Sequence, residues 1–338
     1  MSNIFDVAKR AGVSVKTVSR VMNDAEKVRK TTRERVEQAM QELDYNPSHA
    51  ARELRSARSR SIGMLFGDPS SGFQSRFHHS ALKACDEAGY FLAGGLFDEE
   101  AADWDRQLSA FLSRTRVRNM ILVPPLSGAS ALHERLVERG VSFVLVSPAR
   151  SSKTIPAVRM DDYAAAHEVT RHLLDLGHRR IGHIAGAPDH VSSTLREEGF
   201  VAALREHGQA EIRSDWIRCG MFTFEHALKA AEDLLDTADR PTAIFASNDE
   251  MAAAVYFTAS RLGLQVPQDL SVVGFDDVAI ARTIWPTLTT IAQPYEAMSK
   301  AAVNYLAARD ADSDAEPAAK VITLDYEFIL RKSTAAPR

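Results

Sequence analysis

The spacing of apolar residues changes near residue 60 of the 338-residue chain. Before that point, apolar residues recur every three or four positions, the period of an amphipathic α-helix. From Ser61 onward, nearly continuous apolar runs alternate with helical stretches, which is typical of parallel sheets covered by helices on both faces. The remaining chain is long enough for two such α/β lobes. The predicted strands are SIGMLFG, YFLAGGL, NMILVPP, SFVLVS, RIGHIAG, TAIFASN and LSVVGFDD, and the predicted helices include HHSALKACDEAG, ALHERLVERG, AAHEVTRHLLDLG, REEGFVAALREHG and DEMAAAVYFTASRLG.

Two short helices joined by a tight turn are predicted at the N-terminus. Asn3 can cap the first helix, and Asp6 stands three residues later in the position of a capping box. Gly12 marks the end of this helix, because glycine readily adopts the left-handed conformation that closes many helices. Ser14 is a good N-cap for the second helix.

The second helix has one apolar face and one cationic face. Val18, Val21 and Met22 lie at helical spacing and are predicted to be buried. Lys16 and Arg20 are each two residues from Val18, about 200° around the helix, so both face outward. This arrangement is typical of a DNA-binding helix-turn-helix, because the major groove admits one helix whose Arg or Lys can donate to guanine.

A third helix is predicted to be capped near Thr31 or Thr32 and to bury Val36, Met40 and Leu43. Basic side chains near its start suit DNA phosphates, which set the register of a bound protein rather than its sequence preference. These side chains are Lys27, Arg29, Lys30, Arg33 and Arg35.

Charge is distributed unevenly along the chain. Residues 1–60 hold thirteen Lys or Arg against eight Asp or Glu, whereas the rest holds 28 basic and 37 acidic residues. The net charge of −4 therefore combines a basic head with an acidic body. This asymmetry favours a polyanionic partner for the head, although charge alone leaves an ordinary solvated surface open.

The composition is that of a soluble protein, with 45% hydrophobic and 25% charged residues. No apolar run reaches the roughly 18 residues of a transmembrane helix, and the N-terminus lacks the basic-then-apolar pattern of a signal peptide. Cys85 and Cys219 form no spaced pair and are predicted to be small core residues. These features predict a cytoplasmic protein without membrane association.

The segment DVAKRAGVSVKTVSRVMN, followed by VRKTTRERVEQAMQELDYNPSHAARELRS, resembles the DNA-binding head of the lactose-repressor (LacI/GalR) family of bacterial transcription regulators. The resemblance runs without a gap from Asn3 to about Arg55. It implies that Val15, Lys16 and Arg20 read bases. The residues expected to support the contact at the DNA backbone are Thr17, Ser19 and Asn23, with Lys27 and Arg29 on phosphates.

The segment after the third helix has a pattern of its own. Pro47 can end that helix and start a short one with a small apolar edge that includes Ala51 and Leu54. A single helix this short is marginal in water. Its resemblance to the family's hinge implies that it orders on DNA beside a dimer mate, with Ala51 and Leu54 at the minor groove. A plain Arg-rich linker is the alternative.

The segments LLDLGHRRIGHIAG, ASNDEMA, VPQDLSVVGFDD and PTLTTIAQP are similar to the family's body, which is shared with periplasmic sugar-binding proteins. The resemblance implies a two-lobed α/β body with parallel sheets and a ligand cleft between the lobes. Crossing segments are expected near 159–162, 291–293 and 324–326. The predicted domains are the helix-turn-helix head 1–46, the hinge 47–60 and the effector-binding and dimerisation body 61–332, in which lobe 1 is about 61–159 and 293–323 and lobe 2 about 160–292 and 324–332.

No pattern predicts an enzyme. Phosphate-binding and nucleophile motifs such as G-x-G-x-x-G, G-x-x-x-x-G-K-[ST] and G-x-S-x-G do not occur in the expected contexts. His178 and His183 have no carboxylate at ligand spacing, so no metal is expected. Asp276 and Asp277 are adjacent at a strand end and should point apart, which disfavours an acid–base pair. We expect binding without turnover and no cofactor.

The carboxyl ends of the predicted strands mark a candidate ligand cleft. Asn248 and Asp276 each close an apolar strand, and Arg196 precedes a helix. Together their amide, carboxylate and guanidinium groups could pair with the hydroxyls of a sugar. Each residue alone could equally be a helix cap or an interface residue, but the resemblance assigns all three to the effector.

Aromatic and amide residues extend this set. The resemblance implies that Phe222 packs on a sugar face and that Gln293 reaches the cleft from a crossing segment, although Phe222 could also be core. Phe73 and Phe77 follow the first strand, where the other lobe would meet the ligand. The surrounding SSGFQSRFHHS departs from the usual family pattern. The predicted effector is a sugar, short oligosaccharide or glycoside, and a purine or nucleoside remains the alternative.

The predicted protein is a transcription regulator, most simply a repressor, that binds a near-palindromic operator as a homodimer. Effector binding would change lobe closure and the spacing of the hinges, with induction and co-repression both open. The C-terminal RKSTAAPR lacks apolar heptads, so a dimer is expected rather than a tetramer. Rival interpretations are a periplasmic-type sugar-binding protein without a DNA role and a sugar-metabolising enzyme with a DNA-binding head.

Overall fold

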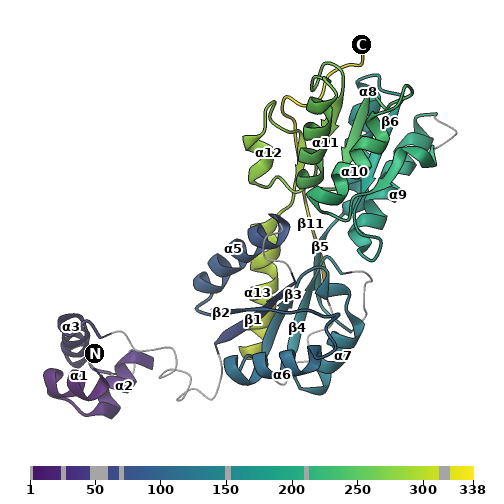
Figure 1. Ribbon diagram of the computed structural model, residues 1–338. Coiled ribbons are helices and arrows are strands. Elements are labelled where there is room, and N and C mark those ends of the chain that lie inside the picture. The colour runs from purple at the N-terminus through teal and green to yellow at the C-terminus, as the bar shows by residue number, and fades with distance from the viewer. Residues whose placement is uncertain are drawn as a thin grey trace. The chain divides into compact units, whose positions relative to one another are not determined.

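The computed structural model describes residues 3–23, 28–45, 60–67, 72–148, 154–208, 213–311 and 320–338. The chain divides into two compact units, Met1–Ser59 and Arg60–Arg338, which we call the head and the body (Figure 1). The two are described separately below.

The described part of the head contains the helices α1 (Ile4–Ala11), α2 (Val15–Asn23) and α3 (Lys30–Glu42). The predicted capping box of α1 is present, because the Asn3 side chain accepts from the N–H groups of Phe5 and Asp6 while the Asp6 carboxylate accepts from the Asn3 N–H. Gly12 ends α1 with φ 65°, as predicted. The Oγ of Ser14 accepts from the N–H of Thr17 at the start of α2.

The predicted start of the third helix was wrong. α3 begins at Lys30, and Arg29 precedes it without a side-chain cap. The Arg29 carbonyl already accepts the first helical hydrogen bonds, from Thr32 at 2.9 Å and Arg33 at 3.1 Å. Thr31 therefore lies inside the first turn, where a capping hydroxyl has no role.

The inward faces of the three helices form one small core. Met22, Met40 and Leu43 pack against its edge and are only partly buried. The helical spacing of apolar residues along the head thus gives a single three-helix core. Its buried members are Ile4, Val7, Ala8, Ala11, Val18, Val21, Val36 and Ala39.

Lobe 1 of the body contains a six-stranded parallel sheet in the order β11-β5-β4-β3-β1-β2 (Figure 1). Helices α5 and α13 cover one face, and α6 and α7 cover the other. All six residues of β1 are buried, which explains why its sequence is a continuous apolar run. The elements are β1 (Ser61–Phe66), α5 (Gly72–Glu87), β2 (Phe91–Leu96), α6 (Trp104–Thr115), β3 (Asn119–Leu122), α7 (Ser130–Glu138), β4 (Ser142–Val146), β5 (Ala157–Met160), α13 (Tyr295–Ala311) and β11 (Val321–Leu324).

Lobe 2 contains a four-stranded parallel sheet in the order β7-β6-β8-β9. Helices α8 and α9 share one core cluster, and α10 and α11 share the other. A two-stranded antiparallel ribbon, β10 with β12, completes the lobe. The elements are α8 (Asp162–Asp175), β6 (Ile181–Ala185), α9 (Val191–Glu206), β7 (Ile217–Cys219), α10 (Phe224–Leu235), β8 (Ala243–Ala246), α11 (Asp249–Arg261), β9 (Ser271–Val273), α12 (Ala279–Thr283), β10 (Thr290–Ala292) and β12 (Glu327–Ile329).

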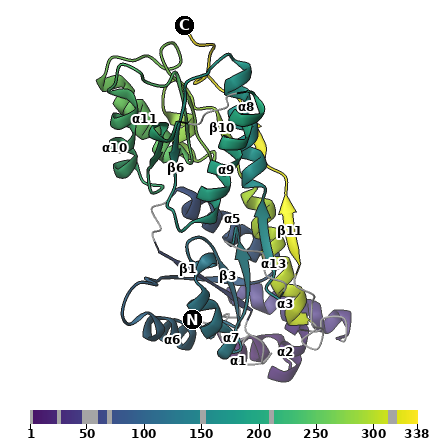
Figure 2. The same ribbon diagram turned by 90° about the vertical axis from the view of Figure 1, so that its right-hand side faces the viewer.

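The chain passes between the lobes three times: from β5 to α8, from β10 to α13, and from β11 to β12 (Figure 2). The predicted fold class, an α-helical head with a two-lobed α/β body of parallel sheets, is confirmed. The predicted set of strands lacked β5, β7, β10, β11 and β12. None of the helices in the described ranges is long and apolar enough to span a membrane.

The two cysteines differ in environment. Cys85 is buried, as predicted, in the core cluster beneath α5. The prediction that Cys219 is a core residue was wrong, because it is exposed at the end of β7, the edge strand of its sheet.

Candidate functional site

A pocket that is partly open to solvent lies between the two lobes of the body. Phe73, Gln74, Pro124 and Ser147 line it from lobe 1, and Gln293 lines it from a crossing segment. Six residues that the sequence predicted for the effector line this one pocket: Phe73, Arg196, Phe222, Asn248, Asp276 and Gln293. Sequence reasoning missed Gln74, Pro124, Ser147, His190 and Ser192.

Arg196 is the best-held polar side chain of the pocket. It projects from α9, is buried, donates through Nε to Asp162 Oδ1 at 2.9 Å, and forms an ion pair with the same oxygen through Nη2 at 2.8 Å. Its Nη1 donates to the Ser247 carbonyl at 2.5 Å, and the guanidinium lies 3.6 Å above the centre of the Phe275 ring. The N–H groups that these two hydrogen bonds do not use remain for a ligand or for Asp276, whose Oδ1 is 4.0 Å from Nη1.

Asp276 is buried beside Arg196 and accepts a hydrogen bond from Gln293 Nε2 at 2.6 Å. Burial raises the pKa of its carboxyl to about 7, against the opposing effect of Arg196. Its φ of 109° is unusual for a residue with a side chain, and its N–H donates to the Ile291 carbonyl at 2.8 Å, which holds this backbone. Asp277 turns to other partners, Arg282 and Arg331, so the adjacent carboxylates do not act as a pair.

Asn248 both caps α11 and lines the pocket. Its Oδ1 accepts from the Met251 N–H at 2.8 Å, and its Nδ2 donates to the Phe222 carbonyl at 3.0 Å. The second amide N–H and a lone pair of the oxygen are left for a ligand. The Phe222 ring lies against Gly186, where a Cβ would be only 2.0 Å from it, and its centre is 5.3 Å from that of the His190 ring. The glycine thus makes room for this aromatic wall.

The lobe 1 side of the pocket is formed by the start of α5. Phe73 lines the pocket and packs against Tyr295, with 5.6 Å between ring centres. The expectation that Phe77 faces the ligand was wrong, because one helical turn further on it points into the core of lobe 1 and is fully buried. Gln74 Nε2 donates to the Pro124 carbonyl at 3.1 Å.

Two buried carboxyl groups, those of Asp162 and Asp276, lie beside the Arg196 guanidinium, and a third, that of Asp249, lies near Asp276. Burial raises the pKa of Asp162, although its ion pair with Arg196 opposes the shift. Burial and the nearby Asp276 raise the pKa of Asp249, which accepts from Thr290 Oγ1 at 2.6 Å and from the Val278 N–H at 2.9 Å. Among the described residues that line the pocket, Arg196 is the only Lys or Arg. The site therefore offers no uncompensated positive charge.

The histidines of the GHRRIGH segment have structural roles. His178 contacts Thr242 Oγ1, Ser271 Oγ and the Ala335 carbonyl within 3.0 Å. His183 is packed between the rings of Phe200 and Phe245, and burial lowers its pKa to about 4. Both rings are therefore held by protein groups.

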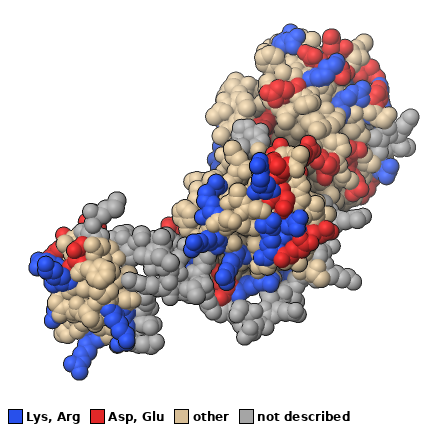
Figure 3. Space-filling view, turned by 60° about the horizontal axis from the view of Figure 1, so that its bottom comes forward, with Lys and Arg blue, Asp and Glu red and all other residues tan. Residues whose placement is uncertain are grey.

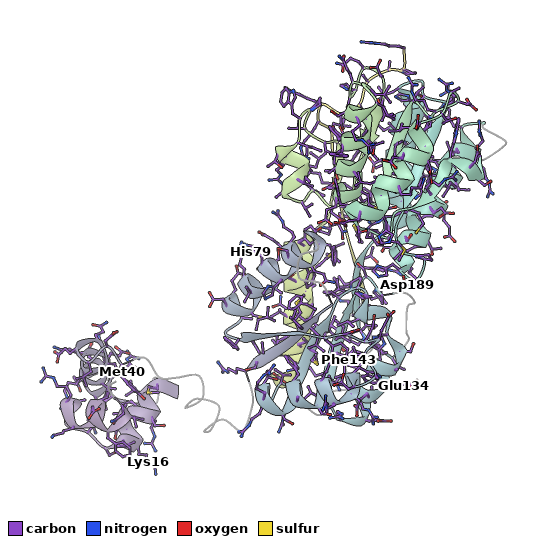
Figure 4. The ribbon with its side chains drawn as sticks, in the orientation of Figure 1. Lys16, Met40, His79, Glu134, Phe143 and Asp189 are labelled. Atoms are coloured by element: carbon purple, nitrogen blue, oxygen red, sulfur yellow. The ribbon has the colours of Figure 1, made fainter. Side chains whose placement is uncertain are left out.

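On the head, Lys16 and Arg20 are exposed on the same face of α2. Lys16 extends from the outer surface of the head, whereas Met40 lies toward its interior (Figure 4). Val15 is half-buried against the head core, so only part of its side chain can meet a base. Three other predicted DNA contacts lie in the described part of the head: Thr17 Oγ1 is 2.9 Å from Ser14 Oγ, Ser19 is half-buried, and Arg29 is exposed. Asn23 ends α2, but its side chain is outside the described part. The remaining predicted contacts, Lys27, Ala51 and Leu54, lie outside the described residues.

Arg35, expected from its charge at a DNA phosphate, is engaged by the end of another helix of the head. Its Nη2 donates to the carbonyls of Ala11 at 2.8 Å and Gly12 at 3.4 Å, at the C-terminal end of α1. A cation at this end of a helix satisfies carbonyls that have no helical partner. Basic side chains nevertheless remain at the surface of the head, where Figure 3 shows them gathered at its edges.

Two stretches of the chain match known families. Residues 3–48 match the bacterial regulatory proteins of the lacI family, and residues 170–334 match the periplasmic binding protein-like domain. The HTH-type transcriptional repressor PurR of Photobacterium profundum is 32% identical, over 98% of each chain.

Solved structures of similar architecture span the same length. The lac repressor dimer bound to operator and the anti-inducer ONPF has a TM-score of 0.80 and 27% identity, with 99% of each chain covered. The complex of the transcriptional regulator CelR with cellobiose has a TM-score of 0.74 and 28% identity, covering 98% of this chain and 100% of that one.

A helix-turn-helix head on a two-lobed, binding-protein-like body defines a class of DNA-binding transcriptional repressors. The chain belongs to the lacI family of bacterial regulatory proteins, as its N-terminal sequence indicated.

Proposed function

We propose that this repressor is controlled by a neutral carbohydrate that binds in the pocket between the lobes. The observation that carries the proposal is the buried array of Arg196, Asp276 and Gln293, in which the 2.6 Å and 4.0 Å contacts hold the groups together. Such an array presents donors and acceptors at the spacing of neighbouring sugar hydroxyls, and Phe222 supplies an apolar wall beside it. The cellobiose bound by CelR, a relative of the same fold, supports the carbohydrate class.

The charge balance of the pocket favours a neutral sugar over a sugar phosphate. Asp162 pairs with Arg196 through a hydrogen bond from Nε and an ion pair with Nη2, and Asp276 lies 4.0 Å from Nη1. A phosphate would bring about two negative charges toward buried carboxyl groups without a free cation among the described lining residues. A hydroxyl group, by contrast, can donate to Asp276 and accept from Arg196.

A purine is the second candidate effector. The aromatic rings of His190, Phe222 and Phe73 all line the pocket and could stack on a flat base. The pKa of about 7 at Asp276 means that its carboxyl can either donate to or accept from a ring nitrogen near neutral pH. These features make purines the necessary comparison in any ligand screen.

The proposed regulator acts in the cytoplasm as a homodimer, without a cofactor and without catalysis. Lys16 and Arg20 of each subunit enter the major groove of one operator half-site. Effector binding shifts the equilibrium between lobe arrangements by as much as its affinities for them differ. That shift changes the spacing of the two heads, and with it the affinity for DNA.

The test is a thermal-shift screen followed by a DNA-binding assay. Glucose, galactose, ribose and cellobiose, the 6-phosphates of glucose and galactose, and hypoxanthine and guanine are added to the purified full-length protein. A ligand that binds the native state raises the melting temperature by mass action. We expect at least one unphosphorylated sugar to do so, and the same sugar to change the affinity for palindromic DNA selected from a random library.

Two variants separate the two halves of the proposal. Lys16→Ala should weaken DNA binding and leave the sugar-induced shift unchanged, whereas Asp276→Ala should abolish the sugar-induced shift. A shift with hypoxanthine or guanine alone would replace the sugar with a purine. Failure to select any palindromic site would contradict the operator-binding role.

A further inference from the structure

We propose that the body makes a DNA contact of its own, in which basic side chains at one end of lobe 1 bind phosphates flanking the operator half-sites. These residues, which we call the basic edge, are Arg60, Arg114, Arg116, Arg118 and Lys320, and all five are exposed. The inference concerns DNA binding by the body and is independent of which effector the pocket takes.

The parallel sheet of lobe 1 brings the basic edge together. Arg60, Arg118 and Lys320 directly precede β1, β3 and β11, and parallel strands of one sheet begin at a common edge. The backbone carbonyls of Arg60 and Arg118 each accept a hydrogen bond of 2.8 Å from a neighbouring strand, which holds both residues at that edge. Arg114 lies in the last turn of α6 and Arg116 ends this helix, which leads directly into β3.

The positive charge of the basic edge is not neutralised by any described carboxylate. Other cations of lobe 1 are paired: Arg106 with Asp103, and both Arg135 and Arg139 with Asp105. The five residues of the basic edge form no ion pair within the described part of the chain. Residues 61–338 as a whole hold 28 basic and 37 acidic residues, so this concentration of one sign is a local feature.

The basic edge and the effector pocket lie at opposite ends of the lobe 1 sheet. Pro124 and Ser147, which line the pocket, follow β3 and β4, whereas the basic edge is at the amino ends of the strands. Figure 3, which brings this end of the body forward, shows Lys and Arg side chains on it. The surface is therefore available while the pocket is occupied.

Covalent linkage carries the basic edge to DNA. Arg60 is the first residue of the body, and residues 46–59 join it to the described helices of the head. Fourteen residues span at most about 50 Å, roughly one and a half turns of B-DNA. When the head is bound to DNA, this linkage keeps the basic edge at a high effective concentration near the flanking phosphates.

Double-stranded DNA is the partner that fits this charge. It carries one negative charge per roughly 1.7 Å of helix axis, and the arginine guanidinium pairs with phosphate in a bidentate manner. Such contacts fix position and add affinity without reading sequence. A cation at the end of α6 could instead serve only the helix dipole, and its loss would then lower stability rather than change the salt dependence of DNA binding.

The experiment measures the salt dependence of DNA binding by the full-length protein. One duplex is trimmed to the palindrome selected from a random library, and the other extends it by about ten base pairs, one helical turn, on each side. Arg116→Gln/Arg118→Gln removes two charges from the basic edge. The matched control, Arg171→Gln/Arg205→Gln, removes two charges from exposed arginines of lobe 2.

On the extended duplex, Arg116→Gln/Arg118→Gln should reduce the slope of log K against log salt by at least about 0.9, the change for one lost phosphate contact. The lobe 2 control and the charge-preserving Arg116→Lys/Arg118→Lys should keep the wild-type slope. On the trimmed duplex all four proteins should agree. Urea unfolding followed by tryptophan fluorescence should give all variants a midpoint near that of wild type, because the replaced residues are exposed.

An unchanged slope for Arg116→Gln/Arg118→Gln on the extended duplex would overturn the proposal, and a lowered urea midpoint in that case would assign the two arginines to the end of α6. An equal reduction in the lobe 2 control, in the lysine variant or on the trimmed duplex would also overturn the flanking contact. If wild type selects no palindromic site, operator binding itself is contradicted, and the role of the basic edge with it.

Discussion

The backbone N–H of Gly72, the first residue of α5 in lobe 1, donates to the carboxylate of Glu250 in α11 of lobe 2 over 2.8 Å. A Cβ at Gly72 would lie 2.9 Å from the Glu250 oxygen and 3.1 Å from a methyl group of Val278. The lobes therefore touch at a position that only glycine can occupy without displacement. The contact is adjacent to Phe73, which lines the pocket from the first turn of α5.

Gly72→Ala should weaken effector binding. The added methyl group must displace the flexible carboxylate end of Glu250 and shift a methyl group of Val278 by a few tenths of an ångström, and we expect a cost of about 1 kcal/mol, the low end for overpacking. If closure bears about 1 kcal/mol of that cost, the apparent affinity for the sugar identified in the thermal-shift screen falls about fivefold. Isothermal titration calorimetry checks the prediction.

The matched control for this prediction is Gly67→Ala. A Cβ at Gly67, also in lobe 1, meets no atom within 4 Å. Its affinity for the same sugar should equal that of wild type. Equal affinities of Gly72→Ala and Gly67→Ala would show that the Gly72 contact does not limit closure.

Arg196→Met should strongly destabilise the body. The substitution leaves Asp162 buried without the guanidinium that it contacts at 2.8 and 2.9 Å. Removal of one partner of a buried ion pair costs about 3–5 kcal/mol, because the other charge is left uncompensated. All three tryptophans, Trp104, Trp216 and Trp285, lie in the body, so urea unfolding followed by tryptophan fluorescence reports this loss.

Two further variants identify the cause of that loss. Asp162→Asn in the Arg196→Met background should recover part of the stability, because it removes the uncompensated carboxylate. Arg106→Met breaks an exposed ion pair with Asp103 and should leave the urea midpoint near that of wild type. A loss in Arg106→Met as large as in Arg196→Met would argue against burial as the cause.

The positions of most predicted effector residues could be read from the sequence because parallel strands end at a common edge. Asn248 and Asp276 follow β8 and β9, which are neighbours in the sheet, and both line the pocket. Whether they bind an effector stays a prediction. Phe77 was misplaced because α5 begins at Gly72, so that one helical turn separates the pocket-facing Phe73 from a core position.

Residues defined by tertiary contacts carried no local signal. Gln74 lines the pocket and bonds to Pro124, which is fifty positions along the chain, so no local sequence pattern could place it there. The charge of Arg35 predicted a contact with DNA phosphate, but its hydrogen-bond partners, the carbonyls of Ala11 and Gly12, lie at the end of another helix and could not be inferred from the local sequence. The capping box of Asn3 and Asp6 was predictable for the opposite reason, since all of its atoms lie within four residues.

The stability of the wild type relative to Asp276→Asn should fall as the pH rises from 5 to 7. Folding raises the pKa of Asp276 from its ordinary 3.8 to about 7. Between these values the folded protein binds a proton that the unfolded chain has released, so stability is lost as the pH rises through this window and is constant above it. The difference in unfolding free energy changes by at most about 1.4 kcal/mol per pH unit. Urea unfolding at pH 5, 6, 7 and 8 measures it, and parallel profiles for the two proteins would contradict the buried, protonated state.

Arg29→Met and Arg35→Met should differ in the salt dependence of DNA binding. Arg29 is exposed before α3, and loss of one phosphate contact should reduce the slope of log K against log salt by about 0.9. Arg35 is held by the end of α1, so its replacement should leave the slope unchanged and lower the hydrogen-exchange protection of the α1 amides. Fluorescence anisotropy with a selected palindromic site gives the slopes, and hydrogen exchange by mass spectrometry gives the protection. If Arg35→Met reduced the slope of log K against log salt and left the hydrogen-exchange protection of the α1 amides unchanged, Arg35 would be a DNA-phosphate contact and not a helix-end contact.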